Sequence, residues 1–557
     1  MKILLVNPVN PNSAYFANLV FRVPYLGVYH LKRLTPENVE AGIWDETVQA
    51  FDMDSLHELP DVAAVSVNFT AAAKRGYEIA DALRNAGVHV IIGGNHATYC
   101  TEEALRHADS VVQGEADEIW PGIVADAEAG RLARVYTAPR LPDLAGIIFP
   151  RRRNPVLDIP SLDLSALADL GGAEGHGRAE VLRHALRQDP GPLSRLLGAL
   201  QGRLAAMAME GSFDFLLRSR LTAPRVRDLL HNLIGQRLYA FLKENREAVI
   251  QAVSGPLGGY LVKKILQVGR GCPVDCEFCS VTAFNGKRYR HYKIDQLVAD
   301  IAELAGDGRG IDRFIVFADD NIVADPRFAK EFFRAIKPLK IHWWSQATIQ
   351  MARDPELLKL AAESGCVGVF YGFETLKQDT LKAVDKGFKV KDYIEVIQRT
   401  HDAGIAVFTG AFVFGLPGDT WQDIEQTVRF CIEQGIDFPQ YSIATPLPGT
   451  RLWKRLYGDS LPSEENWDHY TYTSCTDPVL AYATAMSSEE LNEAWKQAYM
   501  VATDPEAVSR RLSQTAFRTV FMMAGTYFAN HLFSVFSETG YWDRLNNGRK
   551  QEFAMLG

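Results

Sequence analysis

Three closely spaced cysteines carry the chemistry that is easiest to recognise in this chain. Cys272, Cys276 and Cys279 form a C-x3-C-x2-C run. Thiolates hold iron–sulfur clusters, and three of them can bind three irons of a [4Fe-4S] cluster. Complete ligation by the protein would need a fourth ligand, so one iron would stay open to a substrate or a cofactor. The spacing therefore predicts a cluster with one open coordination position.

Other uses of these cysteines fit the sequence less well. Structural zinc sites use four ligands that commonly come as C-x2-C pairs, and the remaining cysteines form no such pair. A disulfide framework is typical of short, cysteine-rich secreted chains, whereas this chain has 557 residues and 7 cysteines. The cysteine pattern therefore favours an iron–sulfur cluster in a reducing compartment, and we expect a cytoplasmic protein.

The cysteine run resembles that of the radical S-adenosylmethionine (SAM) superfamily, in which the open iron binds SAM. Segments 318–321, 371–375 and 414–420 resemble the SAM-contacting positions of this superfamily, in the same order. The resemblance implies these contacts: Phe278 against the cluster and adenine, Asp319 and Asp320 near the methionyl amine, Glu374 near the ribose hydroxyls, and Gly415 in the turn beside adenine. No catalytic acid or base can be assigned from the sequence.

A second repeating pattern must position these residues. Strand-like apolar runs are separated by helical patterns such as those at 294–304 and 326–336. The expected strands are at 265–268, 314–317, 341–346, 367–372, 406–414 and 440–444. Six such units match the partial (β/α)6 barrel of the superfamily. Active sites of α/β barrels lie at the carboxyl ends of the strands, where the motif residues fall.

The N-terminal part of the chain predicts a different α/β domain. Strand patterns at 2–6, 41–44, 62–67, 89–92 and 110–113 alternate with helical patterns, which indicates a doubly wound, Rossmann-like parallel sheet. Ligands of such sheets bind beyond the carboxyl ends of the strands. The candidate ligand contacts follow three of these strands: Ser66, Asn68, Phe69 and Thr70, then Gly93, Gly94, Asn95 and His96, then Gly114 and Glu115.

These turns resemble the cobalamin-binding domain that precedes many radical SAM domains. The family form includes Gly-Gly-x-His-x-Thr and Gly-Glu-x-Asp-Glu, and both are present here. The D-x-H-x-x-G motif that supplies a histidine to cobalt in many cobalamin proteins is absent, so we expect cobalamin without a protein histidine on cobalt. By the resemblance, Asn68, Phe69 and Thr70 would lie under the cobalt, whereas His96 would line the nucleotide tail or cap the next helix. A flavodoxin-like domain that binds a nucleotide, or nothing, is the alternative.

The expected organisation has four parts. Residues 1–145 form the cobalamin-binding domain, 146–260 a linker with a helical insertion, 261–455 the radical SAM domain and 456–557 a helical C-terminal region. A net charge of −9 argues against a nucleic-acid partner. Residues 519–537 lack charged side chains, which favours a buried or membrane-surface helix over a spanning one. The apolar helical patterns favour a hydrophobic, lipid-like small-molecule substrate.

The combined resemblance implies a cobalamin-dependent radical SAM enzyme that methylates an unactivated carbon through methylcobalamin and a 5'-deoxyadenosyl radical. Such an enzyme needs a reductant such as flavodoxin or ferredoxin. A non-methylating cyclase or rearrangement enzyme with the same cofactors is the first alternative. An iron–sulfur electron carrier or sensor is the second, which the SAM-contact segments disfavour because an electron carrier needs no SAM pocket.

Overall fold

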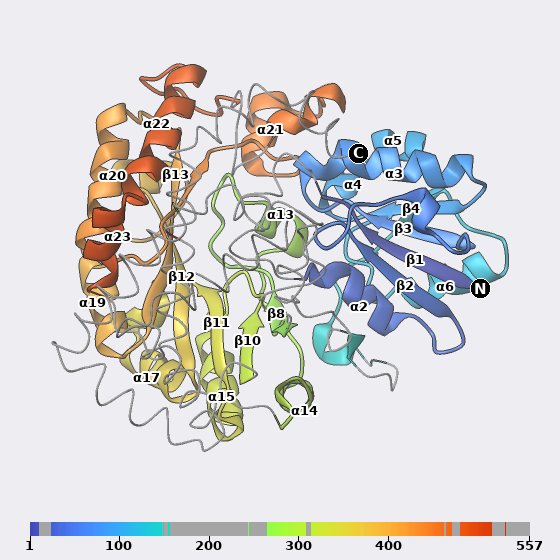
Figure 1. Ribbon diagram of the computed structural model, residues 1–557, viewed down its shortest axis with the longest axis horizontal. Helices are drawn as coiled ribbons and strands as arrows, with labels where there is room; N and C mark the ends of the chain where they lie inside the picture. The colour runs from blue at the N-terminus through green and yellow to red at the C-terminus, as the bar shows by residue number, and fades with distance from the viewer. Residues whose placement is uncertain are drawn as a thin grey trace, which may run out of the picture.

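Two parallel β-sheets form the framework of the protein (Figure 1). The computed structural model describes residues 1–9, 24–147, 149, 154–155, 243, 264–307, 313–461, 464–470, 479–514 and 530. The expectations for the helical insertion and for residues 519–537 lie outside these ranges. Within them, no helix combines the length and the apolar character that crossing a membrane requires.

The N-terminal sheet has six strands in the order β2-β1-β3-β4-β5-β6, and all of its pairings are parallel. Its strands are β1 (Lys2–Asn7), β2 (Glu40–Asp45), β3 (Val62–Ser66), β4 (His89–Gly93), β5 (Ser110–Gln113) and β6 (Val135–Thr137). Its helices are α2 (Leu26–Leu34), α3 (Ala73–Asn85), α4 (Asn95–Tyr99), α5 (Thr101–His107) and α6 (Trp120–Glu128), with 3-10 turns η1 (Met53–Ser55), η2 (Thr70–Ala72) and η3 (Leu144–Gly146). The order reverses between β1 and β3, which is where a doubly wound sheet opens a crevice for a ligand. The predicted Rossmann-like domain is confirmed.

The second sheet has the order β14-β13-β12-β11-β10-β7, again with parallel pairings throughout. Its strands are β7 (Ile265–Leu266), β10 (Phe314–Phe317), β11 (His342–Ala347), β12 (Cys366–Glu374), β13 (Ala406–Phe414) and β14 (Gln440–Ile443). Helices α14 (Ile294–Ala305), α15 (Pro326–Ile336), α16 (Gln350–Arg353), α17 (Pro355–Glu363), α18 (Gln378–Ala383), α19 (Tyr393–Asp402) and α20 (Trp421–Glu433) alternate with them, with 3-10 turns η6 (Lys337–Leu339) and η7 (Val390–Asp392). Six parallel strands with helices on the outside confirm the predicted partial barrel (Figure 1).

A small hairpin interrupts the first unit of the barrel. Strands β8 (Gly269–Arg270) and β9 (Arg290–His291) pair antiparallel, and the intervening loop contains the cysteine run and helix α13 (Ser280–Asn285). The sequence analysis did not predict this hairpin, because two-residue strands leave no periodic signal.

The C-terminal region packs on both domains. Helices α22 (Ser488–Ala502) and α23 (Pro505–Leu512) lie beside α20. Helix α21 (Arg451–Tyr457) and turn η8 (Glu464–His469) instead bring Trp453 and Trp467 into the apolar core on one face of the N-terminal sheet. A second apolar core continues from the N-terminal sheet into the barrel. The two sheets are therefore joined by shared cores as well as by the chain.

Candidate active site

One cavity of about 980 Å³ lies between the two sheets. Its walls include residues at the carboxyl ends of strands in both domains. The N-terminal domain contributes Asn7, Ser66, Asn68, Phe69, Thr70, Gly93, Gly94, Asn95, Gly114 and Glu115. The barrel contributes Phe278, Cys279, Asp320, Trp344, Phe370, Glu374, Thr409 and Ser442. Most of the predicted contacts of both domains therefore face one shared space.

The cysteine loop comprises residues 271–289, between β8 and β9. The hairpin fixes its base, and contacts with the barrel fix its tip. Gly271 has φ +94°, and a Cβ there would lie 2.5 Å from the Arg288 carbonyl oxygen, so only glycine fits. The Cys272 amide donates to the Gly286 carbonyl at 3.2 Å. At the tip, the Glu277 amide donates to Val384, and the Glu277 carbonyl accepts from Leu452. These bonds give the cysteines a defined backbone.

The thiols themselves lie in apolar surroundings. Burial raises the pKa of Cys276 to about 11 and that of Cys279 to about 12, and it also raises the pKa of Cys272. Backbone hydrogen bonds oppose this effect on the pKa of each thiol, the Lys386 ammonium opposes it at Cys272 and Cys276, and the Asn321 amide, whose Nδ2 lies 3.8 Å from Cys272 Sγ, opposes it at Cys272. Metal coordination removes the proton from a thiol outright.

The donor chemistry of these thiols fits an iron–sulfur cluster. Within the described residues, no three His, Cys, Asp or Glu side chains converge closely enough for one metal ion. A cluster does not need such convergence, because each thiolate ligates a different iron. Cys272, Cys276 and Cys279 would hold the three ligated irons.

The two adjacent aspartates after β10 have different surroundings. Asp320 faces the cavity, and its Oδ2 accepts from Asn285 Nδ2 at 3.2 Å. Burial raises the pKa of Asp320 to about 6. Asp319 lies outside the cavity lining and is 1% exposed; its carboxylate accepts from the backbone amides of Val268 and Gly269 at 2.9 and 2.7 Å. The Asp319 carboxylate thus holds the base of the cysteine hairpin, while Asp320 beside it faces the cavity; that both aspartates lie near the methionyl amine stays a prediction.

Glu374 ends β12 in a strained conformation. Its φ is +68°, which a side chain with a Cβ rarely adopts and which is typical of functional sites. Its carboxylate is paired with Lys386 Nζ at 2.5 Å, and both residues are buried. Glu374 lines the cavity, whereas Lys386 is not among the lining residues, and its charge lowers the pKa of the Cys276 thiol. Lys386 was not predicted from the sequence, because a single lysine 12 positions beyond a motif gives no signal.

The turn after β13 is tight and closely packed. Gly415 has φ +76°, and a Cβ there would lie 2.8 Å from the Leu491 side chain. Asp419 closes the turn by accepting from the Leu416 amide at 3.0 Å. Leu416 belongs to a small apolar cluster against which Phe278 packs. Gly415 itself does not line the cavity, so it shapes the turn while Phe278 forms part of the wall.

The N-terminal turns line the cavity with both glycines and polar side chains, and hydrogen bonds tie the turns to each other. Gly94 has φ +106°, and a Cβ there would lie 2.6 Å from the Val67 carbonyl oxygen. Thr98 donates to the Gly94 carbonyl and accepts from the Gly114 amide, which ties two turns together. Phe69 is 50% exposed and lines the cavity beside these turns.

His96 does not have the predicted role. It is 1% exposed, lies outside the cavity lining, and caps no helix. Its ring contacts Thr70 Oγ1, Tyr77 Oη and Glu103 Oε1 at 3.4, 3.2 and 3.4 Å. The histidine is therefore a buried structural residue. Among the described lining residues His30 is the only histidine, and its Nε2 is 2.6 Å from Asp117.

Comparison with known proteins agrees with this geometry. Residues 266–431 match the profile of the Radical SAM superfamily. The chain is 26% identical to the bacteriochlorophyllide d C-12(1)-methyltransferase of Chlorobaculum tepidum over 75% of this chain and 70% of that protein. It is 25% identical to an uncharacterised methyltransferase of Pyrococcus horikoshii over 90% and 92% of the two chains.

A solved structure is also similar. It is the radical SAM methyltransferase TsrM of Kitasatospora setae with cobalamin and a [4Fe-4S] cluster bound, with a TM-score of 0.47, 15% identity, and coverage of 81% of this chain and 76% of that one. Radical SAM enzymes use a [4Fe-4S] cluster and SAM, act on small molecules and need a reductant. The chain therefore contains a radical SAM domain at residues 266–431, which includes the cysteine run and most strands of the partial barrel.

Proposed function

We propose that the protein is a cobalamin-dependent radical SAM methyltransferase that acts on an unactivated carbon of a small molecule. The observation that carries the proposal is that the carboxyl ends of both parallel sheets line one shared cavity. A radical SAM domain alone would need only the barrel side of this space. The second set of turns supplies a separate ligand site that opens directly onto Cys279 and Asp320.

The part of the cavity that the N-terminal domain lines fits a large ligand such as cobalamin. Gly93 lines it and has no side chain, so the backbone itself forms the wall there, and an added Cβ would make ordinary contact with Val112 Cβ at 3.5 Å. Ser66, Asn68 and Asn95 add uncharged polar groups, with Asn68 oriented by its own bond to Ser66 Oγ at 2.7 Å. Two relatives that the chain matches over most of their length are named as methyltransferases, which supports a methyl-group carrier at this site.

The barrel residues have the chemistry to orient SAM, which carries a sulfonium cation and a zwitterionic tail. Asp320 is a cavity-facing carboxylate near the cysteine loop, and Glu374 is a second one at the end of β12. Phe278 and Phe370 give apolar surface between them. When bound, the cluster with SAM would supply hydrogen abstraction from the substrate, and cobalamin would supply the methyl group.

The substrate pocket is the part of the cavity deeper in the barrel. Its described lining is aromatic and uncharged polar, with Trp344, Phe370, Thr409, Gln440 and Ser442. Such walls exclude water and favour a largely apolar substrate that carries few polar groups. We further propose a reducing cytoplasmic location, a flavodoxin- or ferredoxin-type reductant, and contact with a membrane surface only if the substrate is a lipid.

The test is a labelling experiment with the complete chain. Protein reconstituted anaerobically with iron, sulfide and cobalamin is incubated with a reductant, a cell extract and SAM that carries a deuterated methyl group. We expect 5'-deoxyadenosine together with a product that gains the labelled methyl group. Formation of 5'-deoxyadenosine with a product that never contains the label would favour the non-methylating cyclase or rearrangement enzyme.

A further inference from the structure

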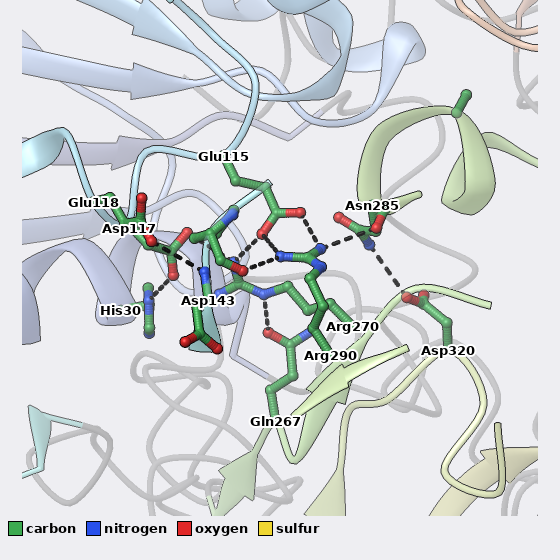
Figure 2. Close-up of polar contacts among 12 residues, drawn as sticks. His30, Glu115, Asp117, Glu118, Asp143, Gln267, Arg270, Asn285, Arg290 and Asp320 are labelled. Atoms are coloured by element: carbon green, nitrogen blue, oxygen red, sulfur yellow. Dashed lines mark hydrogen bonds and ion pairs between the residues drawn. The ribbon is translucent and has the colours of Figure 1, made fainter. Parts of the chain in front are cut away.

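The Gly-Glu-x-Asp-Glu turn makes contacts that a ligand-binding turn does not need. Each of its three carboxylates is bonded to protein (Figure 2). Glu115 accepts from Arg270 Nη1 at 2.7 Å and from Arg290 Nη2 at 2.5 Å. Asp117 accepts from Arg270 Nη1 at 2.7 Å and contacts His30 Nε2 at 2.6 Å. Glu118 accepts from the Asp143 amide at 3.0 Å.

The four charged side chains at the centre of this network are buried and balanced. The Glu115 and Asp117 side chains are 2% and 4% exposed, and those of Arg270 and Arg290 are 11% and 10% exposed. Although burial alone would raise the pKa of Asp117, Arg270 and His30 hold it well below its usual range. A buried ion cluster adds little net stability, but it fixes the geometry of the groups it joins. We call these four residues the interdomain clamp.

The clamp joins the Gly-Glu-x-Asp-Glu turn (114–118) to the cysteine loop. Arg270 ends β8 and stands two residues before Cys272, and Arg290 begins β9 at the other end of the same loop. The Arg290 guanidinium also donates to the Asn285 carbonyl at 2.9 Å, and Asn285 Nδ2 donates to Asp320. Figure 2 shows this continuous chain of contacts from His30 to Asp320. A shift of the turn would therefore move both ends of the cysteine loop.

We propose that Glu115 and Asp117 are positioning residues that act through Arg270 and Arg290. Through these two arginines they fix the cysteine loop and Asp320 relative to the part of the cavity that the N-terminal domain lines. The catalytic value of this fixed separation rests on the proposed function, because it matters when one reaction uses ligands on both sides. Reaction rates are sensitive to misplacement of reacting groups by about 1 Å. Glu115, which also lines the cavity and stays a predicted cobalamin contact, is in addition the centre of an interdomain contact.

The chain offers a matched control for a merely structural carboxylate. Glu103 is also buried, and it also joins two regions, since it accepts from Tyr77 Oη and from Trp467 Nε1, both at 2.8 Å. It touches neither the cavity nor the cysteine loop. Both Glu115→Gln and Glu103→Gln remove one buried charge with little change of shape, so a general loss of stability would affect both variants.

The first measurement is hydrogen exchange of the backbone amides of residues 271–279 in the full-length, cluster-loaded protein. In Glu115→Gln we expect these amides to exchange about tenfold faster than in the wild type, because the loop loses a charged hydrogen-bond partner. Glu103→Gln should leave them unchanged. Equal protection in folded Glu115→Gln and wild type would overturn the proposal. If Glu115→Gln does not fold, Asp117→Asn gives the same test.

The second measurement is the ratio of transferred methyl groups to 5'-deoxyadenosine. We expect this ratio to fall about tenfold in Glu115→Gln, with Glu115→Asp recovering part of it and Glu103→Gln keeping the wild-type ratio. An unchanged ratio in Glu115→Gln would overturn the positioning role. A wild type that binds no cobalamin would overturn the proposed function instead, and hydrogen exchange would then decide on the clamp alone.

Discussion

The cysteine loop and the N-terminal turns both carry family motifs, but the two regions differ in which motif side chains are already bonded to the protein. In the loop, the cysteine thiols are available to bind a cofactor, and hydrogen bonds of the backbone hold the loop in place. In the turns, His96, Thr98 and Glu115 are bonded to protein, and the glycines form the wall of the cavity. A motif in sequence therefore identifies a place in the fold, but not which of its members face the ligand.

The cysteines give the largest effect with which to test this contrast. Replacing Cys272, Cys276 and Cys279 with Ala should abolish bound iron and 5'-deoxyadenosine formation, because these are the thiols of the cysteine loop and Cys279 among them lines the cavity. Iron content and the product chromatogram on anaerobic preparations measure both. Cys431→Ala, at a buried thiol away from the loop, is the control and should keep its iron. Reductive SAM cleavage by the triple variant would contradict the assignment.

Variants of the Glu374–Lys386 ion pair separate an effect on the free energy of unfolding from an effect on SAM cleavage. Lys386→Met leaves a buried carboxylate without its cation and should lower the free energy of unfolding by about 3–5 kcal/mol. Glu374→Gln combined with Lys386→Met should recover much of this stability in denaturant titrations, because neither charge remains. SAM cleavage should stay low in the double variant if Glu374 contacts SAM. Full cleavage in the stable double variant would show that the pair is only structural.

Asp320 predicts a pH dependence of SAM binding. Because burial raises its pKa to about 6, the carboxylate is ionised at pH 7 and takes up a proton as the pH falls below 6. The ionised form attracts the SAM cation, so the dissociation constant should rise about tenfold per pH unit well below 6. Titrations of the cluster-loaded protein between pH 5 and 8 would measure this change. In Asp320→Asn the affinity should be lower and the profile flat; a pH-dependent profile would assign the titration to another group.

The smallest expected effect is a spectroscopic one at cobalt. We expect the cob(II)alamin resonance spectrum to lack nitrogen hyperfine splitting from a protein histidine, since the one histidine among the described lining residues, His30, is held by Asp117. A splitting that disappears in His30→Phe would show that His30 is a cobalt ligand after all. A splitting that persists in that variant would place the ligand outside the described lining residues.

The sequence predicted the regular elements well, because both sheets are parallel and buried. Strands β5, β10 and β13 have the predicted bounds, and their apolar runs read clearly. The hydrogen bonds of Asp319 and His96 could not be predicted. The position of a residue in a motif does not reveal whether its side chain is already bonded to neighbouring backbone amides or hydroxyls. Arg270 and Arg290 were missed for a related reason: their partners lie 153 to 175 residues away in the chain. Such pairings depend on how two domains meet.

Gly93 offers the sharpest test of the two-site account. A Cβ at Gly93 meets only Val112 within ordinary contact distance, so Gly93→Ala should be tolerated, whereas Gly93→Leu places bulk at the cavity wall. Gly94 is a poor probe, because any Cβ there collides with the Val67 carbonyl and strains the backbone.

The most direct measurement pairs bound cobalamin, by absorbance, with 5'-deoxyadenosine, by chromatography, on the same preparations of Gly93→Leu and Glu374→Gln. The account predicts that Gly93→Leu loses cobalamin and keeps SAM cleavage, while Glu374→Gln keeps cobalamin and loses most SAM cleavage. If both folded variants lose both properties, or if Gly93→Leu retains cobalamin, the cavity does not hold two separate ligand sites and the central claim is wrong.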